Sequence, residues 1–508
     1  MELVAALSLA TDLGLGLPQE HVLRQTVIAR RIAAAAGLSA EEQSAVSYVS
    51  LLAWVGCISD SHEMSTWFGD DLQLRADSYE VDMAGLAMMR FMLPKVGASE
   101  PPLRRLTVIG RFLTAGRREA GAALITHCQT TGDIASRLGL GEAVRHALAQ
   151  VFERWDGAGV PAGLRGDQAL VVTRVVQIAD DLEVLHRVRG AEAAIAMLRQ
   201  RRGTQFDPSL VDLCCARLDG LLAGLDELDV WEEVLGGLEE PELTEDELTE
   251  ALEAVADYAD LKSPSWLGHS RGVAALARAA GGRLRLSEPE LLLLYRAGLV
   301  HDLGVTGVSS LVWDQPGTFT VGDRERVRTH PYLTERVLAR PGPLARIGAL
   351  AALHHERLDG SGYPRGVRAE SLSRSARVLA AADVMQALGE NRPHRAAVPA
   401  TERPEVMRAE VAAGRLDGEA VNAVLAASGH RVRRKPELPA GLTAREVEVL
   451  VMIASGLPNK EVARQLSISA RTVGSHLEHA YAKIGVSTRG AAAMFVMRHG
   501  LMTETSVI

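Results

Sequence analysis

Two segments of this chain repeat the same pattern of residues, and the repeat limits the folds that the sequence can adopt. The segment from His269 to Gly304 aligns without a gap with the segment from His21 to Gly56. Further on, residues 356–360 match residues 153–157, and a glycine and a proline follow at the same spacing in both. An insertion in the first copy separates its two matched blocks. A pattern that recurs over such lengths predicts one structural unit built twice.

The composition indicates a helical protein of several domains. The chain has 508 residues, which is more than one hydrophobic core usually serves, and it is 47% hydrophobic but only 4% aromatic. No apolar run is long enough to span a bilayer, and the N-terminus lacks the basic start of a signal peptide. We therefore expect an all-α, cytoplasmic protein with no membrane segment. The cysteines have no zinc-like spacing, and we expect reduced thiols at Cys57, Cys128, Cys214 and Cys215.

Charge divides the chain further. The net charge is -9, but residues 219–262 hold sixteen acids and a single lysine, whereas residues 430–508 hold eleven Lys or Arg against six acids. The separation into an acidic connector and a basic tail is more informative than the net charge of the chain. We predict two tandem helical bundles and a small four-helix domain. The predicted parts are a degenerate first copy at 1–218, an acidic helical connector at 219–261, a second copy at 262–430, a basic linker at 431–440 and a C-terminal domain at 441–508.

The second copy holds histidines and aspartates in the order expected of a metal site. His301-Asp302 ends an apolar helix predicted at 291–300, and Asp383 lies in an apolar helix predicted at 378–388, where an unpaired carboxylate is costly. Mixed His and Asp ligands suit manganese, iron or zinc. The candidate ligands are His269, His301, Asp302, His330, His354, His355 and Asp383. Seven ligands suit two divalent ions bridged by the aspartate, an arrangement that can clamp a phosphodiester and activate water.

The first copy has lost most of these ligands. Ala53 and Trp54 stand where the second copy has His301-Asp302, and Val151 and Phe152 stand where it has His354-His355. The ligands that remain are His21, His127 and Asp180. We expect a scaffold or dimerisation domain here, with a cavity that binds a ligand without metal chemistry as the minor alternative.

Residues 262 to about 400 resemble an HD-GYP domain, the branch of the HD superfamily that hydrolyses cyclic di-GMP. The resemblance is carried by His269, His301-Asp302, His330-Pro331, the run from His354 to Pro364, Asp383, and residues 392–395. The first copy resembles a degenerate member of the same family. The resemblance implies an all-helical bundle with the seven residues as metal ligands, and His301, Asp302 and His330 as catalytic residues. It places the cyclic dinucleotide, or a related phosphodiester, over the turn that contains Gly360, Gly362, Tyr363 and Pro364.

One departure from the family pattern bears on activity. The family's His-Asp-x-Gly-Lys reads His301 to Val305 here, so a lysine that would neutralise phosphate charge is missing. Lys262 or Asp260 could supply charge from another direction, although we expect both at a solvated helix end. The missing lysine favours the alternative function, a catalytically inactive receptor in which the same pocket binds a cyclic dinucleotide and controls the C-terminal domain.

The C-terminal residues show the spacing of a helix-turn-helix domain. Thr443 and Glu446 predict a capping box for a helix that runs to about Ser455. Asn459 is expected to cap a helix at 460–466, Ser469 a third that runs to about residue 484, and a last helix spans about 488–499. A helix, a tight turn and a second helix read DNA in the major groove.

This region resembles a LuxR-type helix-turn-helix over about sixty residues, carried by residues 442–446, 459–463, 469–477 and 483–486. The expected phosphate contacts are Lys460, Arg471, Thr472, Lys483 and Arg489, and the expected base contacts are Ser475, Glu478 and His479. A two-fold DNA site predicts a homodimer. The favoured function is a transcription regulator with a metal-dependent phosphodiesterase domain. A third interpretation keeps only DNA binding and treats residues 1–430 as an oligomerisation scaffold.

Overall fold

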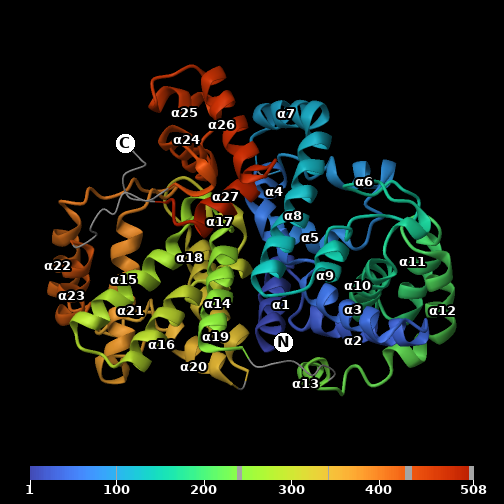
Figure 1. Cartoon of the computed structure of the whole chain (residues 1–508), viewed down its shortest axis with the longest axis horizontal. Helices are drawn as coiled ribbons and strands as arrows, with labels where there is room; N and C mark the ends of the chain where they lie inside the picture. The colour runs from blue at the N-terminus through green and yellow to red at the C-terminus, as the bar shows by residue number, and fades with distance from the viewer. Residues whose placement is uncertain (99, 237–242, 341, 430–437, 503–508) are drawn as a thin grey trace. The chain divides into compact units, whose positions relative to one another are not determined.

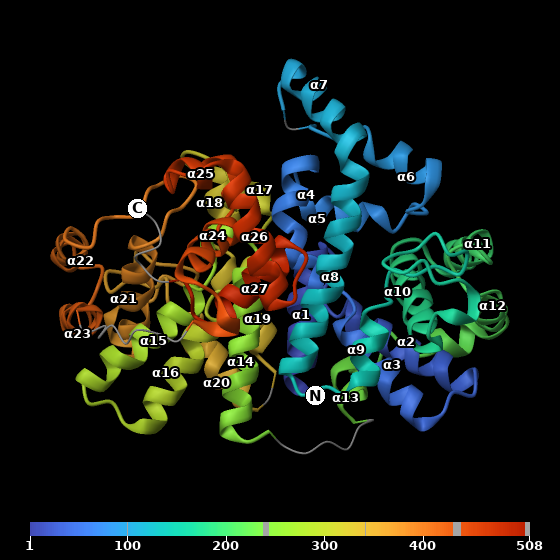
Figure 2. The same cartoon turned by 45° about the horizontal axis from the view of Figure 1, so that its top comes forward.

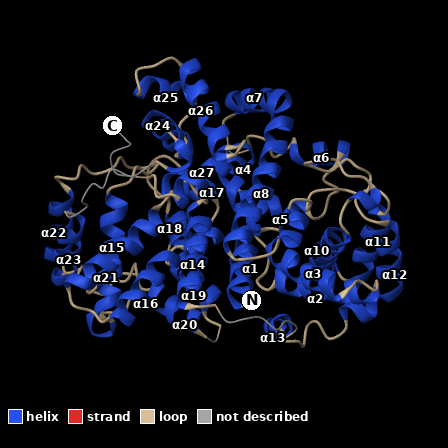
Figure 3. Ribbon diagram, in the orientation of Figure 1, coloured by secondary structure: helices blue, strands red, loops and turns tan. Residues whose placement is uncertain are grey.

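The computed structural model describes the chain except for residues 99, 237–242, 341, 430–437 and 503–508. All regular structure in the described residues is helical, and only isolated bridges occur besides (Figure 3). The predicted all-α fold class is therefore confirmed for this part of the chain. None of the described helices combines the length and the apolar character needed to cross a membrane. Most of the basic linker predicted at 431–440 lies outside the described residues.

The chain separates into two compact units, residues Met1–Thr244 and Glu245–Ile508. The helices of the first unit (Figure 1) are α1 (Glu2–Leu15), α2 (His21–Ala35), α3 (Ala40–Leu52), α4 (Ser61–Phe68), α5 (Asp71–Ser78), α6 (Gly85–Met92), α7 (Pro102–Arg111), α8 (Arg117–Arg137), α9 (Glu142–Leu148), α10 (Val171–Arg189), α11 (Ala191–Arg201), α12 (Pro208–Leu222) and α13 (Val230–Leu235). The short helix η1 (Val55–Asp60) follows α3.

The second unit begins with α14 (Glu245–Asp260), so the predicted acidic connector contributes one helix to each unit. The remaining helices are α15 (His269–Arg283), α16 (Glu288–Val300), α17 (Ser310–Trp313), α18 (Val321–Val327), α19 (His330–Leu338), α20 (Pro343–Ala351), α21 (Arg374–Leu388), α22 (Arg403–Ala412), α23 (Gly418–Ser428), α24 (Ala444–Ala454), α25 (Asn459–Gln465), α26 (Ala470–Ile484) and α27 (Arg489–Arg498). The short helix η5 (Leu303–Gly307) follows α16.

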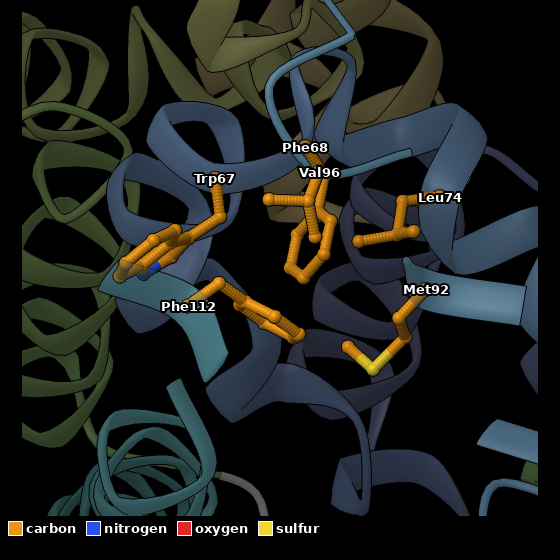
Figure 4. Packing of buried hydrophobic residues seen from close by; sticks show 6 residues of the cluster. All are labelled: Trp67, Phe68, Leu74, Met92, Val96 and Phe112. Carbon is orange, nitrogen blue, oxygen red and sulfur yellow. The ribbon is translucent and has the colours of Figure 1, made fainter. Parts of the chain in front are cut away.

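The insertion in the first copy builds a small core of its own. Trp67 and Phe68 at the end of α4 pack against Phe112, with ring centroids 5.6 Å apart in each pair, and Leu74, Met92 and Val96 complete the cluster (Figure 4). Figure 2 shows α6 and α7 beyond the N-terminal end of α8. The insertion is therefore a packed addition to the first unit.

The same hydrogen-bonded aspartate occurs at a helix start in both units. Asp12 accepts a hydrogen bond from the backbone N–H of Val22 at the start of α2, and Asp260 accepts bonds from the N–H and hydroxyl of Ser270 at the start of α15. Burial raises the pKa of Asp12 to about 7 and that of Asp260 to about 8. These carboxyls close the first turn of a buried helix, where the N–H groups lack partners within the helix.

A buried glutamate organises the glycine-rich loop in each unit. Glu153 accepts hydrogen bonds from the N–H groups of Ala162 and Leu164, and Glu356 accepts them from Arg365 and Val367 at 2.8 and 3.0 Å. A polar group without a partner would be costly at such depth, so each carboxylate fixes the course of the loop around it.

The structure corrects the expected placement of Lys262 and Asp260. Neither lies at a solvated helix end, because Lys262 is fully buried and Asp260 is only 1% exposed. The chain turns directly from α14 through residues 263–268 into α15, and Asp260 becomes part of the entry to that helix. The sequence could not show this, since burial of a helix end depends on what packs over it.

Most of the helix caps predicted for the helix-turn-helix region are confirmed. Thr443 and Glu446 form the capping box, Ser469 accepts a hydrogen bond from the N–H of Thr472, and Gly485 ends α26 in the left-handed conformation. The predicted Asn459 cap is wrong, because Pro458 takes the position before the first turn with φ -72° and ψ 155°, and Asn459 is already helical. The fixed φ of proline sets the helix start one residue early.

Candidate functional site

The structure brings all seven predicted ligands of the second unit together. The start of α15 supplies one, the end of α16 two, the start of α19 one, the loop after α20 two and the middle of α21 one. In that order they are His269, His301, Asp302, His330, His354, His355 and Asp383. Three overlapping groups have their ligand atoms within 4.8 Å of one another: His330, His354 and His355; His269, His301 and Asp383; and His301, Asp302 and His354.

The two carboxylate oxygens of Asp302 face different histidines. Its Oδ2 atom lies 3.4 Å from Nε2 of His301 and 3.6 Å from Nε2 of His269. Its Oδ1 atom lies 3.3 Å from Nε2 of His330 and 3.4 Å from Nε2 of His354. The carboxylate therefore stands between two sets of imidazole nitrogens, which is the geometry that a bridging ligand requires.

Asp383 repeats this division on the other side of the pocket. Its Oδ1 atom lies 3.5 Å from Nε2 of His269 and 3.9 Å from Nε2 of His301, while its Oδ2 atom lies 3.6 Å from Nδ1 of His355. Nε2 of His330 and Nε2 of His354 are 3.1 Å apart. One group of ligands is thus centred on His269 and His301, and the other on His330, His354 and His355.

Backbone carbonyls orient three of the imidazole rings in the same way. Nδ1 of His301 lies 2.8 Å from the carbonyl oxygen of Gly298, and Nδ1 of His330 and His354 lie 2.6 and 2.7 Å from carbonyls three residues earlier. Because a carbonyl only accepts, Nδ1 carries the hydrogen and Nε2 presents its lone pair to the pocket. This is the arrangement that partner groups impose on metal-binding histidines.

Glu390 is a site residue that the sequence analysis missed. Both of its carboxylate oxygens lie 3.0 Å from Nδ1 of His269, and Arg392 donates to the same carboxylate at 2.6 Å. Glu390 follows Asp383 by seven residues, two helical turns, which places it along the same face just beyond α21. The seven-residue spacing from Asp383 is the feature of the sequence that could have predicted this position. The carboxylate fixes the ring of His269 and increases the basicity of its Nε2 atom.

Replacing Glu390 with glutamine should weaken metal binding. An amide no longer draws the Nδ1 hydrogen with a full charge, and loss of such a partner costs about 10- to 100-fold in metal affinity. Competition with a chromogenic chelator measures the change. Glu370→Gln is the matched control because Glu370 is exposed in the short helix η6 (Ala369–Ser371) before α21. Unchanged affinity in Glu390→Gln would leave the residue with a role in folding alone.

Apart from that of His269, the shifted pKa values in the pocket favour the protonation states that a metal needs. Burial by itself would raise the pKa of Asp302, but His301 and the hydrogen bonds of His330 and His354 outweigh it and hold that pKa well below its usual range. Burial lowers the pKa of His301 to about 4 and places the pKa of His355 well below its usual value. Ionised carboxylates and neutral imidazoles are the forms that bind divalent ions.

Two further observations show that the residues present fit metal ions. The buried Nε2 atom of His301 has no hydrogen-bond partner in the part of the chain that the structure describes. Burial opposes a charge on His269, yet Glu390 and Asp383 outweigh it and raise the pKa of His269 well above its usual value. A divalent ion at Nε2 of His269 would replace this proton, because the carboxylates that attract the proton attract any cation.

The glycine-rich turn carries an aromatic wall to the edge of this pocket. The N–H of Tyr363 donates to the carbonyl of His355, and the two rings lie 4.7 Å apart between centroids. Gly362 is required here, since a methyl group at its Cα would overlap the backbone of Glu356 and Arg357. Of the four predicted substrate-binding residues, Tyr363 is the one whose ring meets the metal ligands.

Val305 does not face the pocket as a phosphate-binding lysine would. Its side chain is 1% exposed and belongs to an apolar cluster with Trp266, Val308, Val312 and Trp313. The Trp266 and Trp313 rings are 4.6 Å apart, and Trp313 also lies 5.9 Å from His330. The position that differs from the family pattern therefore supports the packing beneath the site.

In the first unit the corresponding pocket is filled by side chains. Trp54 and Phe152 lie 5.9 Å apart, and the His127 ring packs 4.7 Å from Phe152 while its Nε2 atom lies 2.6 Å from the carbonyl of Ala53. Two of the residues that replace ligands therefore pack together at this place. Of the three candidate ligands that remain, His127 is not grouped with His21 and Asp180 among the described residues, and it lies instead against the aromatic rings and the carbonyl.

His21 is instead held by two buried carboxylates. Its Nε2 atom lies 2.9 Å from Asp180 and its Nδ1 atom 2.5 Å from Glu183, whose other oxygen accepts from Arg24. Burial alone would lower the pKa of His21, but Asp180 and Glu183 raise it to about 10. Both ring nitrogens of His21 are hydrogen-bonded to carboxylates, and Ala53 and Trp54 stand where the second unit has further ligands, so this ion-pair network stabilises the fold instead of a metal.

The predicted DNA contacts fall into two sets. Exposed positions on α25 and α26 include Lys460, Arg471, Thr472, Ser475, Glu478 and His479. Lys483 has a structural partner, since its Nζ atom lies 2.7 and 2.9 Å from the carboxylate oxygens of Glu446. Arg489 is half-buried at the start of α27. The first set presents polar and basic groups on the helices that a helix-turn-helix domain places against DNA.

Comparison with known proteins identifies both regions. The family model "HD domain" matches residues 119–210 and 253–420, and the model "Bacterial regulatory proteins, luxR family" matches residues 440–496. The 3'3'-cGAMP-specific phosphodiesterase 3 of Vibrio cholerae is 30% identical over 404 residues, which cover 78% of this chain and 88% of that protein. The cyclic di-GMP phosphodiesterase response regulator RpfG of Xanthomonas campestris is 33% identical over 172 residues, covering 34% of this chain and 45% of that protein.

A solved structure is similar over most of the chain. The crystal structure of a cyclic GMP-AMP specific phosphodiesterase of V. cholerae (V-cGAP3) superimposes with a TM-score of 0.58 at 25% sequence identity. The similarity covers 85% of this chain and 98% of that one.

Proposed function

This chain belongs to the HD domain family and ends in a luxR-family helix-turn-helix domain, and from that premise we propose a DNA-binding regulator whose second unit is a metal-dependent phosphodiesterase for cyclic dinucleotides. The observation that carries the proposal is the pair of ligand groups divided by the two oxygens of Asp302. Two divalent ions, when bound there, would stabilise the attacking and leaving oxygens of a phosphodiester.

The chain's own residues account for the rest of the reaction. His269, His301 and Asp383 would hold one ion, and His330, His354 and His355 the other, with Asp302 between them. Asp302 is an ionised carboxylate between the two ligand groups and can accept a proton from the attacking water, whereas both ring nitrogens of His330 are taken up by the Val327 carbonyl and the pocket. Tyr363, whose ring lies beside His355, would form an aromatic wall against the bound substrate at the edge of the pocket.

The two HD-type segments are proposed to be copies of one domain, the first of them degenerate. The family model matches a segment in each unit, and the paired constructions at Asp12 and Asp260 and at Glu153 and Glu356 support the same conclusion. Domain bounds of 1–218 and 262–430 remain our proposal. We propose a scaffold role for the first copy, which the buried ion pairs of His21 support.

The substrate is proposed to be a 3',5'-linked cyclic dinucleotide, with cyclic di-GMP and 3'3'-cGAMP as the two candidates that the named relatives suggest. The test is hydrolysis of each by purified protein loaded with Mn²⁺, Fe²⁺ or Zn²⁺, followed by chromatography. Linear or mononucleotide product from either one supports the enzyme and identifies its preferred substrate. Metal-dependent binding without product would support the alternative, a catalytically inactive receptor; absence of both would contradict each proposal.

DNA binding by the C-terminal domain is proposed to rest on phosphate contacts from its exposed basic residues. Arg471→Ala should weaken binding to duplex DNA by about tenfold across sequences and lower the salt dependence by about one charge. Fluorescence anisotropy at several salt concentrations measures both. Arg408→Ala removes the same charge from an exposed position on α22 and should change neither. A loss confined to one DNA sequence would instead assign Arg471 to base recognition.

The regulator is proposed to act as a homodimer, since helix-turn-helix proteins commonly read two-fold sites. Sedimentation velocity with and without a palindromic duplex tests this. A monomer bound to DNA at one-to-one stoichiometry would contradict it.

A further inference from the structure

The proposed substrate carries two phosphodiester groups, and the metal pocket accounts for one of them. A cyclic dinucleotide closes its ring through two linkages on opposite sides. When one lies between the two ligand groups, the other keeps its negative charge outside them. A phosphate in a protein site is usually met by a cation, and arginine suits it because its guanidinium presents several donors in one plane. The rim of the pocket should therefore hold an arginine that is available to a ligand.

Most arginines around the pocket are already committed to the protein. Arg392 donates to Glu390 at 2.6 Å, and Arg365 pairs closely with Glu335. Arg357 donates to the carbonyls of His354 and Glu356, and Arg395 to the carbonyls of Ala387 and Leu388. These guanidinium groups hold loops and the carboxylate of Glu390 in place. A ligand that used them would have to displace those contacts.

Arg328 differs from these arginines in its position and in how weakly it is paired within the protein. It lies two residues before the ligand His330, and its guanidinium carbon is 5.2 Å from the centroid of the Tyr363 ring. That ring is 4.7 Å from His355 and 6.3 Å from His330, so the guanidinium stands beside the second ligand group, separated from it by one aromatic ring.

The ion pair of Arg328 is weak enough to yield to a phosphate. Its partner is Glu325, one helical turn earlier, at 3.6 Å, and the two side chains are 47% and 69% exposed. Exposed pairs of this kind contribute little to stability. The side chain is thus both near the metal ligands and open to solvent.

We infer that Arg328 binds the second phosphate of the cyclic dinucleotide and so selects for substrates with two linkages. The inference rests on the proposed function and deepens it. Tyr363 positions the guanidinium by contact with its ring face. Val305 is buried in the apolar cluster with Trp266 and Trp313, so a positive charge for the second phosphate has to come from the rim of the pocket. Arg328 is a binding residue, not a catalytic one, since it does not reach the reacting atoms.

The test compares two substrates that differ in their number of phosphates. Arg328→Gln should raise KM for the cyclic dinucleotide by about tenfold or more, as expected for a charge-assisted hydrogen bond, with kcat little changed. Hydrolysis of bis(4-nitrophenyl) phosphate, which has one phosphate, should stay within about twofold, because the ions address that group alone. Arg328→Lys should recover part of the loss. Metal content, measured by elemental analysis, should be unchanged in both variants.

Arg326→Gln is the matched control, since Arg326 is exposed on α18 close to Arg328 in the sequence. It should leave both substrates unaffected. Equal losses on both substrates in Arg328→Gln, or no change on either, would overturn the inference. If the wild type binds the cyclic dinucleotide without cleaving it, calorimetric Kd replaces KM and an unchanged Kd in Arg328→Gln overturns it. A wild type that neither binds nor cleaves it would remove the proposed function itself, a result independent of any Arg328 variant.

Discussion

Replacing Asp302 with alanine should abolish metal binding at both ligand groups and reduce phosphodiester hydrolysis by about three orders of magnitude or more. The carboxylate is the only one of the seven whose two oxygens each face two histidines, at 3.3 to 3.6 Å. Its removal would leave Asp383 as the one carboxylate among the ligands, with its oxygens divided between the two groups. That single shared charge should be too little to hold a divalent ion at either group.

Elemental analysis and hydrolysis of bis(4-nitrophenyl) phosphate measure the two effects separately. Asp302→Asn keeps the shape of the side chain but not its charge, and it should lose metal almost as completely. Asp246→Asn, at an exposed position on α14, is the control for a lost negative charge and should retain both properties. Full metal content in Asp302→Asn would contradict the bridging role and reassign this residue to proton transfer.

The second large effect is expected in the first unit, where His21→Gln should lower the free energy of unfolding by about 3 kcal/mol, the order observed when one partner of a buried ion pair is removed. Asp180 and Glu183 lie 2.9 and 2.5 Å from the imidazole and would lose their shared cation. Arg24 still pairs with Glu183 and limits the loss. Urea denaturation followed by intrinsic fluorescence gives the value, with exposed His146→Gln as the control.

The loss should also depend on pH. The pKa of His21 is about 10 in the folded protein and about 6.5 when the chain is unfolded. A raised folded-state pKa contributes stability that is complete below the unfolded value and disappears as pH rises through the folded one. The difference between wild type and His21→Gln should therefore be largest near pH 6 and shrink steadily toward pH 10. A difference that grows with pH would show that His21 is neutral in the fold.

Much of the local structure could be predicted from sequence because the signals are local. The Thr443 and Glu446 capping box and the Ser469 cap each involve residues three apart, and such contacts form within one helical turn. The end of α16 at Val300 follows the same logic, since an apolar helix stops where His301 and Asp302 begin. The cap predicted at Asn459 is wrong because the neighbouring Pro458 occupies the N-cap position of α25.

The sequence by itself determined the helical fold class and the set of seven residues that meet in the second unit, because the repeat shows which of those positions one copy lost and the other kept. Only the tertiary structure decided how the residues divide. Nothing in the order of the chain gives each oxygen of Asp302 its own pair of histidines, places Glu390 behind His269, or buries Lys262 while Arg328 stays at the rim. Those outcomes depend on which helices pack against one another, and burial and charge partners are properties of that packing.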